Sequence, residues 1–314
     1  MVEAREIFSE LTAITKPMHC GKVKNLMLGE NKSLRVGGGY EIHNIREWQP
    51  EDPLEHIDLE ASLPTWPKKV YVLEMFEMKN APVIFVADIS PSMFVGFNES
   101  GGKFKLLLQS LGALGLGANR LRDPAGILCF SDKIEFYLPP RFGSGWLCHL
   151  SRLLYSKAEK FETLKRSGRL TVAGSDLNSA LRFLIVRLAR RQCSIAIFSD
   201  FVDVINGQTE LDPKVIRTLS ALHNFNVIAI FLDEPEEFAW NRGSGTVAVQ
   251  DAETGNIEII KSREAKTLRQ RFIERREELR KRLQKVGIDS TVISYGDHFN
   301  QLAQFLSERK AIHR

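Results

Sequence analysis

Short, uninterrupted apolar runs alternate with segments of helical periodicity through the middle of the chain. The apolar runs predict buried strands, and they occupy residues 83–87, 125–130, 194–199 and 227–232, with a further strand candidate at 134–138. The intervening segments carry apolar residues at helical spacing and predict helices at 103–121, 145–156, 178–190 and 212–223. Strands that alternate with helices predict an α/β fold, with a mostly parallel sheet and helices on both faces.

The two ends of the chain follow other patterns. Residues 3–15 predict a helix that ends before Pro17, and residues 17–80 mix turn residues with short strand-like pieces, which predicts an irregular accessory segment. The last part predicts a hairpin with its turn at Thr254-Gly255, a charged helix, a strand and a closing helix, at 246–260, 262–286, 289–296 and 299–308. We therefore divide the chain into residues 1–80, the N-terminal helix and accessory segment, and residues 81–314, the α/β domain with its C-terminal hairpin and helices.

Composition narrows the class of protein. Of the 314 residues, 43% are hydrophobic and 26% charged, which is typical of a soluble globular protein. The net charge of +4 is too small to argue for nucleic-acid binding by itself. The cysteines at 20, 129, 148 and 193 lack metal-binding spacing and indicate reduced thiols. Because no signal-peptide pattern and no membrane-length apolar stretch is present, we expect a cytoplasmic protein without a membrane partner.

Oxygen-bearing side chains follow two of the predicted central strands. Asp88 ends the first apolar run, with Ser90 and Ser92 in the loop behind it, and Asp200 ends another run after Ser199. A third loop, VAGSDLNSAL, places Ser175 just before a helix. Since ligands gather beyond the carboxyl ends of parallel strands, we expect these side chains to meet at one edge of the sheet.

This oxygen-only inventory suits a hard divalent cation. Mg²⁺ prefers about six oxygen ligands in octahedral geometry and keeps some waters. We predict a site for Mg²⁺, or Mn²⁺, that is formed by Asp88, Ser90, Ser92, Ser175 and Asp200. Neutral hydroxyl ligands would leave such a metal short of negative charge, so that it would attract an external carboxylate. The predicted function is therefore adhesion and not catalysis.

The three loops resemble those of the von Willebrand factor A domain. In that domain, D-x-S-x-S, then G-[T/S]-D-L-x-x-A-L, then an apolar strand that ends in Asp, form the metal-ion-dependent adhesion site. Asp88, Ser90 and Ser92 match the first loop, Ser175 matches the threonine of the second, and Asp200 the aspartate of the third. Serine at 175 keeps the hydroxyl but loses the methyl group that restricts the rotamer. The resemblance implies a von Willebrand factor A-like, Rossmann-like fold.

The segment YEIHNIREWQPEDPLEHIDLEAS resembles a bacterial family catalogued as domain of unknown function, number fifty-eight. Arg46, Pro50, Asp52, Ile57 and Asp58 fit the pattern of that family. Four substitutions indicate a divergent member: Trp48 for tyrosine, Glu51 for glycine, His56 for arginine and Leu59 for tryptophan. FSDKIEFYLPPRFG also resembles the family, so that the resemblance spans roughly residues 35–235. Members are often encoded beside MoxR-type AAA+ ATPases, and the resemblance implies such an ATPase as partner, with this chain as its adaptor or metal-dependent cofactor.

Other interpretations stay open. Ser90 and Ser92 are common turn formers, and Ser175 competes with Asp176 and Asn178 as a helix cap. Asp123, Asp132 and Asp203 read as solvated loop residues, while Asp52 and Asp58 are expected to organise the accessory segment through Arg46 or backbone amides.

Two further functions compete with the interaction module. One is a Mg²⁺-dependent hydrolase or phosphotransferase, although Ser90 stands where aspartyl-phosphate enzymes carry a second Asp, and no phosphate loop or nucleophile-elbow motif is present. The other is nucleic-acid binding through the basic helix at 262–286, whose glutamates favour local ion pairs instead. We therefore expect a non-catalytic protein-binding module without a nucleic-acid partner.

Overall fold

The structure is a computed structural model of the whole chain. It describes residues 32–50, 52, 54–78, 82–95, 102–143, 145–167, 174–188, 193–221, 225–234, 246–250 and 257–312. These form two compact units, divided in the sequence between Ala81 and Pro82. The helix predicted at 3–15 lies outside the described residues. In the described ranges, no helix combines the length and apolar character that crossing a bilayer requires.

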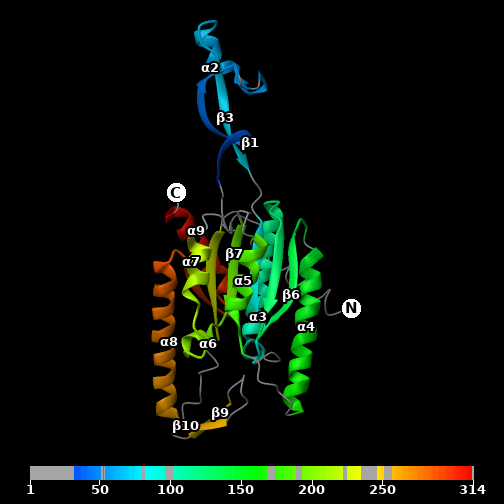
Figure 1. Cartoon of the computed structure of the whole chain (residues 1–314), viewed down its shortest axis with the longest axis vertical. Coiled ribbons are helices and arrows are strands. Elements are labelled where there is room, and N and C mark those ends of the chain that lie inside the picture. Colours follow the sequence, from blue (N-terminus) through cyan, green and yellow to red (C-terminus); the bar gives the residue numbers. More distant parts are fainter. Residues whose placement is uncertain are drawn as a thin grey trace. The chain divides into compact units, whose positions relative to one another are not determined.

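The larger unit is built on a six-stranded sheet with the strand order β11-β8-β7-β4-β5-β6. Figure 1 labels β7 and β6 of this sheet. The strands are β4 (Val83–Asp88), β5 (Ala125–Phe130), β6 (Ile134–Arg141), β7 (Cys193–Ser199), β8 (Phe225–Asp233) and β11 (Asp289–Ser294). Neighbouring strands are parallel, except that β6 pairs antiparallel with β5 at one edge. Every residue of β4, β5 and β7 is buried, which explains why these strands read as apolar runs.

Helices cover both faces of this sheet. On one face lie α3 (Lys103–Arg120), α4 (Gly145–Arg166) and α9 (His298–Ile312), and on the other lie α5 (Leu177–Leu188), α7 (Pro213–Ala221) and α8 (Ser262–Lys285). Successive residues of β4 point to opposite faces of the sheet. Phe85 packs in the core beneath α3, α4 and α9, and Ile84 and Val86 pack in the core beneath α5, α7 and α8. The predicted α/β class, with a mostly parallel sheet between two helical layers, is confirmed.

The helices predicted from residue 103 onward are present with shifted ends. The largest shift is in α4, which continues to Arg166 because Ala158 and Phe161 extend its buried stripe. The backbone N–H of Lys214 donates to Asp212 Oδ1 at 2.9 Å, so Asp212 caps the N-terminus of α7. In α8, Leu279 and Leu283 are buried, whereas Leu268 is 44% exposed. The helix is therefore buried at Leu279 and Leu283, where it packs on the second face of the sheet, and not at Leu268.

A hairpin precedes α8. It pairs β9 (Thr246–Gln250) antiparallel with β10 (Ile257–Lys261). The turn predicted at Thr254-Gly255 lies outside the described residues.

The smaller unit contains a three-stranded sheet in the order β1-β3-β2. Its elements are β1 (Lys32–Glu47), η2 (Leu54–His56), β2 (Ile57–Asp58), α2 (Leu59–Ser62), η3 (Leu63–Thr65) and β3 (Tyr71–Met78). The pairing of β1 with β3 shifts register in three places, so that the segment is irregular as predicted. Arg46 donates to both carboxylate oxygens of Asp52, at 2.6 and 2.6 Å, and Asp58 accepts the N–H of Ala61 at 3.2 Å. These two aspartates organise the segment, as expected.

Candidate functional site

The ends of β4 and β7 lie side by side because the two strands are parallel neighbours. Asp88 is the last residue of β4, and Asp200 directly follows Ser199, the last residue of β7. The hydroxyl of Ser175, just before α5, donates to Asp88 Oδ2 at 2.9 Å, and the hydroxyl of Ser199 donates to the same oxygen at 2.7 Å. Residues far apart in the sequence thus converge on one buried carboxylate.

The loop behind β4 wraps around the other oxygen of Asp88. The backbone N–H of Ser90 donates to Asp88 Oδ1 at 2.9 Å. The Ser90 and Ser92 hydroxyl oxygens lie 3.1 Å apart, and both side chains are buried. Ser92 belongs to η4 (Pro91–Phe94), the 3-10 turn that carries the chain away from the strand.

A small pocket lies beside Asp88, between the loop before α5 and the segment that follows β7, and neither Ser90 nor Ser92 lines it. It is lined by Asp88, Ser175, Leu177, Ser199, Asp200, Phe201, Val202, Asp203 and Val204, and its volume is about 10 Å³. That volume is close to the room that one water molecule or one small cation requires. Four of the five predicted site residues are linked by hydrogen bonds in the series Ser175, Asp88, Ser90 and Ser92, and the fifth, Asp200, shares this pocket with Asp88 and Ser175.

Asp203 also belongs to the site, although the sequence suggested a solvated loop residue. It is 5% exposed, and its Oδ2 accepts the backbone N–H of Ser175 at 2.8 Å. Its Oδ1 has no hydrogen-bond partner among the described residues. The reading was wrong because α6 (Val202–Ile205) turns the side chain inward, toward the loop before α5.

The chain bends sharply between Asp200 and Asp203. Phe201 has a φ of 54°, in the left-handed region that a bulky residue rarely adopts. Its N–H donates to Ser199 Oγ at 2.9 Å, and its ring packs on Phe231 with a centroid distance of 4.3 Å. Such conformations cost roughly 1–3 kcal/mol and persist where the surroundings hold them. Here the bend places both aspartates at the same pocket.

A lysine enters the site from α3. Lys103 is 3% exposed, and its Nζ lies 2.8 Å from Asp200 Oδ2. Just before it, Gly102 has a φ of 108° and donates its N–H to Glu234 Oε2 at 2.8 Å. Glycine adopts this φ without strain. Lys103 and Glu234 were not among the predicted site residues. A usable signal for Lys103 was a lysine in the first turn of a helix, where the helix dipole disfavours positive charge.

Burial and charge act together on Asp88. Burial raises the pKa of this carboxyl first, and the nearby charge of Asp200 raises it further. Hydrogen bonds from Ser199 and Ser90 act in the opposite direction without cancelling the shift. The site therefore favours an added positive charge, because a cation would relieve the cost of ionising Asp88.

The donor set can be tested against an octahedral cation. Neighbouring ligands of Mg²⁺, at about 2.1 Å from the metal, lie about 3.0 Å apart. The Ser90–Ser92 oxygen separation of 3.1 Å matches that spacing. Within the described ranges, no cluster of three or more His, Cys, Asp or Glu side chains is arranged to hold a metal. A cation here would therefore depend on hydroxyl oxygens, and the hydroxyls present fit that need.

A family model described as "Protein of unknown function DUF58" matches residues 44–282. The chain belongs to the DUF58 family. The match runs from the accessory unit through the α/β unit and includes Asp88, Ser175 and Asp200.

No curated protein matches this DUF58 chain. Among solved structures, similar ones include the PilB minor pilin from Streptococcus sanguinis, with a TM-score of 0.38, and a point mutant of that pilin, with a TM-score of 0.35. Both are 12% identical and are matched over 78% of this chain. The chain spans 64% and 65% of their lengths. Likeness at this level carries no conclusion about this chain.

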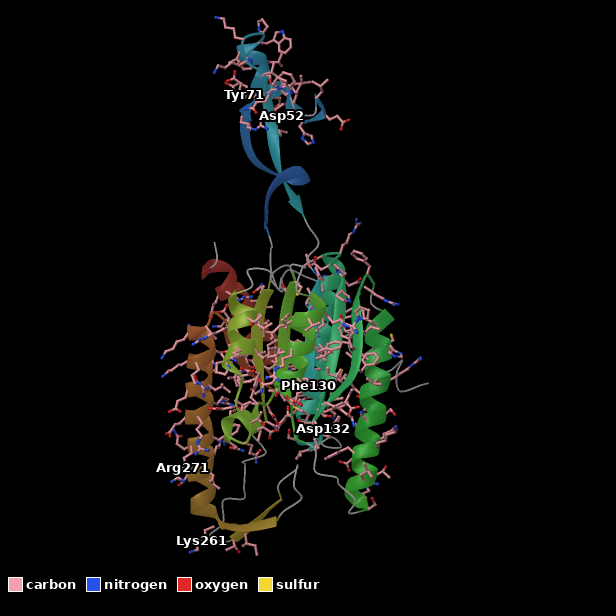
Figure 2. All side chains as sticks on the ribbon, in the orientation of Figure 1. Asp52, Tyr71, Phe130, Asp132, Lys261 and Arg271 are labelled. Atoms are coloured by element: carbon pink, nitrogen blue, oxygen red, sulfur yellow. The ribbon has the colours of Figure 1, made fainter. Side chains whose placement is uncertain are left out.

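A larger cavity in this DUF58 protein lies away from the site. It has a volume of about 520 Å³ and is lined by residues of α8, β11 and α9. Four of its charged groups form two ion pairs, since Arg280 binds Glu277 at 2.9 Å and Arg309 binds Asp289 at 2.5 Å. Arg280 also donates to the Ser290 carbonyl at 3.1 Å, which covers part of the edge of β11. We therefore place the candidate site at the carboxyl ends of β4 and β7. Figure 2 labels Phe130 and Asp132, which lie at the same end of the sheet.

Proposed function

We propose that this DUF58 chain is a metal-dependent protein-interaction module with a von Willebrand factor A-like adhesion site. The observation that carries the proposal is the convergence of Ser175, Ser199 and the Ser90 amide on one buried carboxylate, Asp88. Buried carboxylates and hydroxyls without a histidine or thiol are the donors that Mg²⁺ and Mn²⁺ select.

Each residue has a defined part in this proposal. Ser90, Ser92 and Ser175 would hold the cation through hydroxyl oxygens, and Asp88 and Asp200 would balance its charge. Asp203 lines the pocket and holds the Ser175 loop by accepting its N–H, and its second carboxylate oxygen has no hydrogen-bond partner among the described residues. A bound Mg²⁺ or Mn²⁺ would supply an open coordination position for a carboxylate of another protein. We propose a MoxR-type AAA+ ATPase as that protein, following the family resemblance in the accessory segment and the three loops.

A Mg²⁺-dependent hydrolase or phosphotransferase is the second candidate, and one observation favours it. Lys103 places an ammonium group among carboxylates, as phosphoryl-transfer sites require. Against it, Ser90 stands where an aspartyl-phosphate enzyme has its acid–base aspartate. We therefore expect no ATPase, phosphatase or esterase activity from the isolated protein. Turnover that disappears in Asp88→Ala would favour the enzyme.

Metal binding is tested by thermal unfolding in EDTA and in Mg²⁺ or Mn²⁺. At about 100 times its dissociation constant, the metal should stabilise the wild type by about 2.7 kcal/mol. Ser92→Ala removes one proposed ligand oxygen and should lose most of this gain. Ser151→Ala is the matched control, since Ser151 is a buried serine of α4 that bonds the Cys148 carbonyl. Melting curves that neither metal nor chelator changes would argue against the site.

Partner binding is tested by titrating the candidate ATPase with and without EDTA. Wild type and Ser151→Ala should bind only with metal, and Ser92→Ala should not bind. A further control reverses charge on the exposed basic face of α8, with Arg271→Glu and Arg275→Glu (Figure 2 shows Arg271). Arg276 is unsuitable because it is buried and pairs with Asp233 at 3.0 Å. Equal binding by Ser92→Ala in EDTA would show that the ATPase is held elsewhere.

A further inference from the structure

Lys103 lies where both burial and the helix dipole disfavour a cation. It is the first residue of α3 and is 3% exposed. A buried ammonium group is costly unless it is paired, and the N-terminus of a helix repels positive charge. Its position is explained by Asp200, whose Oδ2 lies 2.8 Å from Nζ, and by Glu234, which accepts the N–H of the preceding glycine.

The negative charge of the pocket exceeds what this lysine neutralises. Asp88, Asp200 and Asp203 all line the pocket, and the ammonium group contacts Asp200. Asp203 Oδ1 has no partner in the part of the chain that the structure describes, although the side chain is 5% exposed. The site is thus neutralised only in part, on the Asp200 side.

A divalent cation and Lys103 would compete for Asp200. The carboxylate oxygen that faces the ammonium group is bonded to it, and two cations at short distance repel strongly in a buried site. We infer that Lys103 is a tethered cation that neutralises Asp200 in the metal-free protein and has to leave this carboxylate when a divalent metal binds. This inference rests on the proposed metal site and says how that site is regulated. The lysine lowers the affinity for the metal and stabilises the folded protein when no metal is bound.

The test is Mn²⁺ affinity, measured by the loss of the free-Mn²⁺ electron paramagnetic resonance signal, in wild type and Lys103→Met. The variant keeps a long side chain without its charge, and it should bind Mn²⁺ about tenfold more tightly or better. In EDTA it should also melt at a lower temperature than wild type, because Asp200 loses its partner. Lys105→Met, which changes the same charge two residues along α3, is the matched control and should leave Mn²⁺ affinity within about twofold of wild type.

The outcomes separate this inference from the metal site itself. Equal Mn²⁺ affinity of wild type and Lys103→Met would refute the competition between Lys103 and the metal, but not the metal site itself. Binding by Lys103→Met alone supports the tethered cation and refutes metal dependence of the wild type. Absence of binding in both proteins overturns the metal site and the inference together.

A second measurement keeps the inference testable if Lys103→Met does not fold. The acetylation rate of the Lys103 amine in wild type, followed by mass spectrometry, should increase on adding Mn²⁺, since release from Asp200 exposes the amine. Lys105 serves as the internal reference in the same spectra. An unchanged Lys103 rate at saturating Mn²⁺ would overturn the inference.

Discussion

Asp52 in the accessory unit and Asp88 in the α/β unit are both aspartates with close hydrogen-bond donors, yet their pKa values move in opposite directions. Hydrogen bonds from Arg46, followed by the N–H of Gln49, lower the pKa of Asp52 to about 2. Burial raises the pKa of Asp88, and the charge of Asp200 adds to the effect. A guanidinium partner outweighs everything else at Asp52, whereas the neutral hydroxyls around Asp88 do not offset the loss of water.

The comparison shows which carboxylate is available to a ligand. Asp52 already has its cation and serves the local turn. The donors to Asp88 among the described residues are neutral, so that its ionised form still gains from an added cation. The same side chain is thus structural in one unit and poised for binding in the other.

The largest expected effect on the pH dependence of stability comes from His298. It is a buried basic group, whereas Asp88 is a buried acidic group. Burial lowers the pKa of His298 to about 4, and both ring nitrogens lack hydrogen-bond partners among the described residues. Below about pH 6.5 the imidazole is protonated in the unfolded chain but stays neutral in the folded protein. The free energy of unfolding should therefore fall by roughly 2 kcal/mol as the pH falls from about 6.5 to 4. His298→Leu should flatten this part of the curve in urea unfolding. His149→Leu, which removes an exposed imidazole, is the matched control.

Asp88→Asn in metal-free protein is expected to have the next largest effect. Because the folded pKa lies above the ordinary value, the contribution of Asp88 to stability is present below about pH 4 and is lost as the pH rises through the folded pKa. At neutral pH in EDTA, Asp88→Asn should therefore be more stable than wild type by roughly 1 kcal/mol. Urea unfolding at several pH values measures the difference. A variant that is less stable than wild type throughout would show that the Asp88 hydrogen bonds outweigh its burial.

Asp52→Asn should have the smallest effect and the opposite sign of pH dependence. A depressed pKa contributes stability above the ordinary value, and this is lost as the pH falls toward about 2. The pair with Arg46 is partly exposed, so salt should weaken it. Amide exchange at Gln49, whose N–H donates to Asp52, should be faster in Asp52→Asn than in wild type, and less so in 1 M salt. Equal exchange rates in the two proteins would refute this role of the carboxylate.

Local sequence pattern was sufficient for most of the fold. The apolar runs at β4, β5, β7 and β8 mark strands because strands buried on both faces have no polar side to present. The cap at Asp212 was readable from residues next to each other. The pairing of Arg46 with Asp52 could also be predicted, since the two residues are only six positions apart in the sequence.

The candidate site was predictable in part, because parallel strands carry their carboxyl ends to one edge. Asp88 and Asp200 follow strands, and the general rule for α/β sheets places them together. Ser175 could be included only through the motif of its loop. That they would hold a metal stays a prediction.

The sequence by itself determined the strand and helix pattern, the sheet class and the oxygen-rich loops, because these depend on periodicity and on neighbours along the chain. Only the tertiary structure decided that Lys103 pairs with Asp200, 97 residues later, and that Asp203 turns inward. Contacts of that kind depend on where the start of α3 meets the end of β7, which no local pattern encodes. From the sequence alone, both Lys103, at the start of an apolar helix, and Asp203, in a loop, are expected to be solvated. Both are buried only because elements distant in the sequence pack around them.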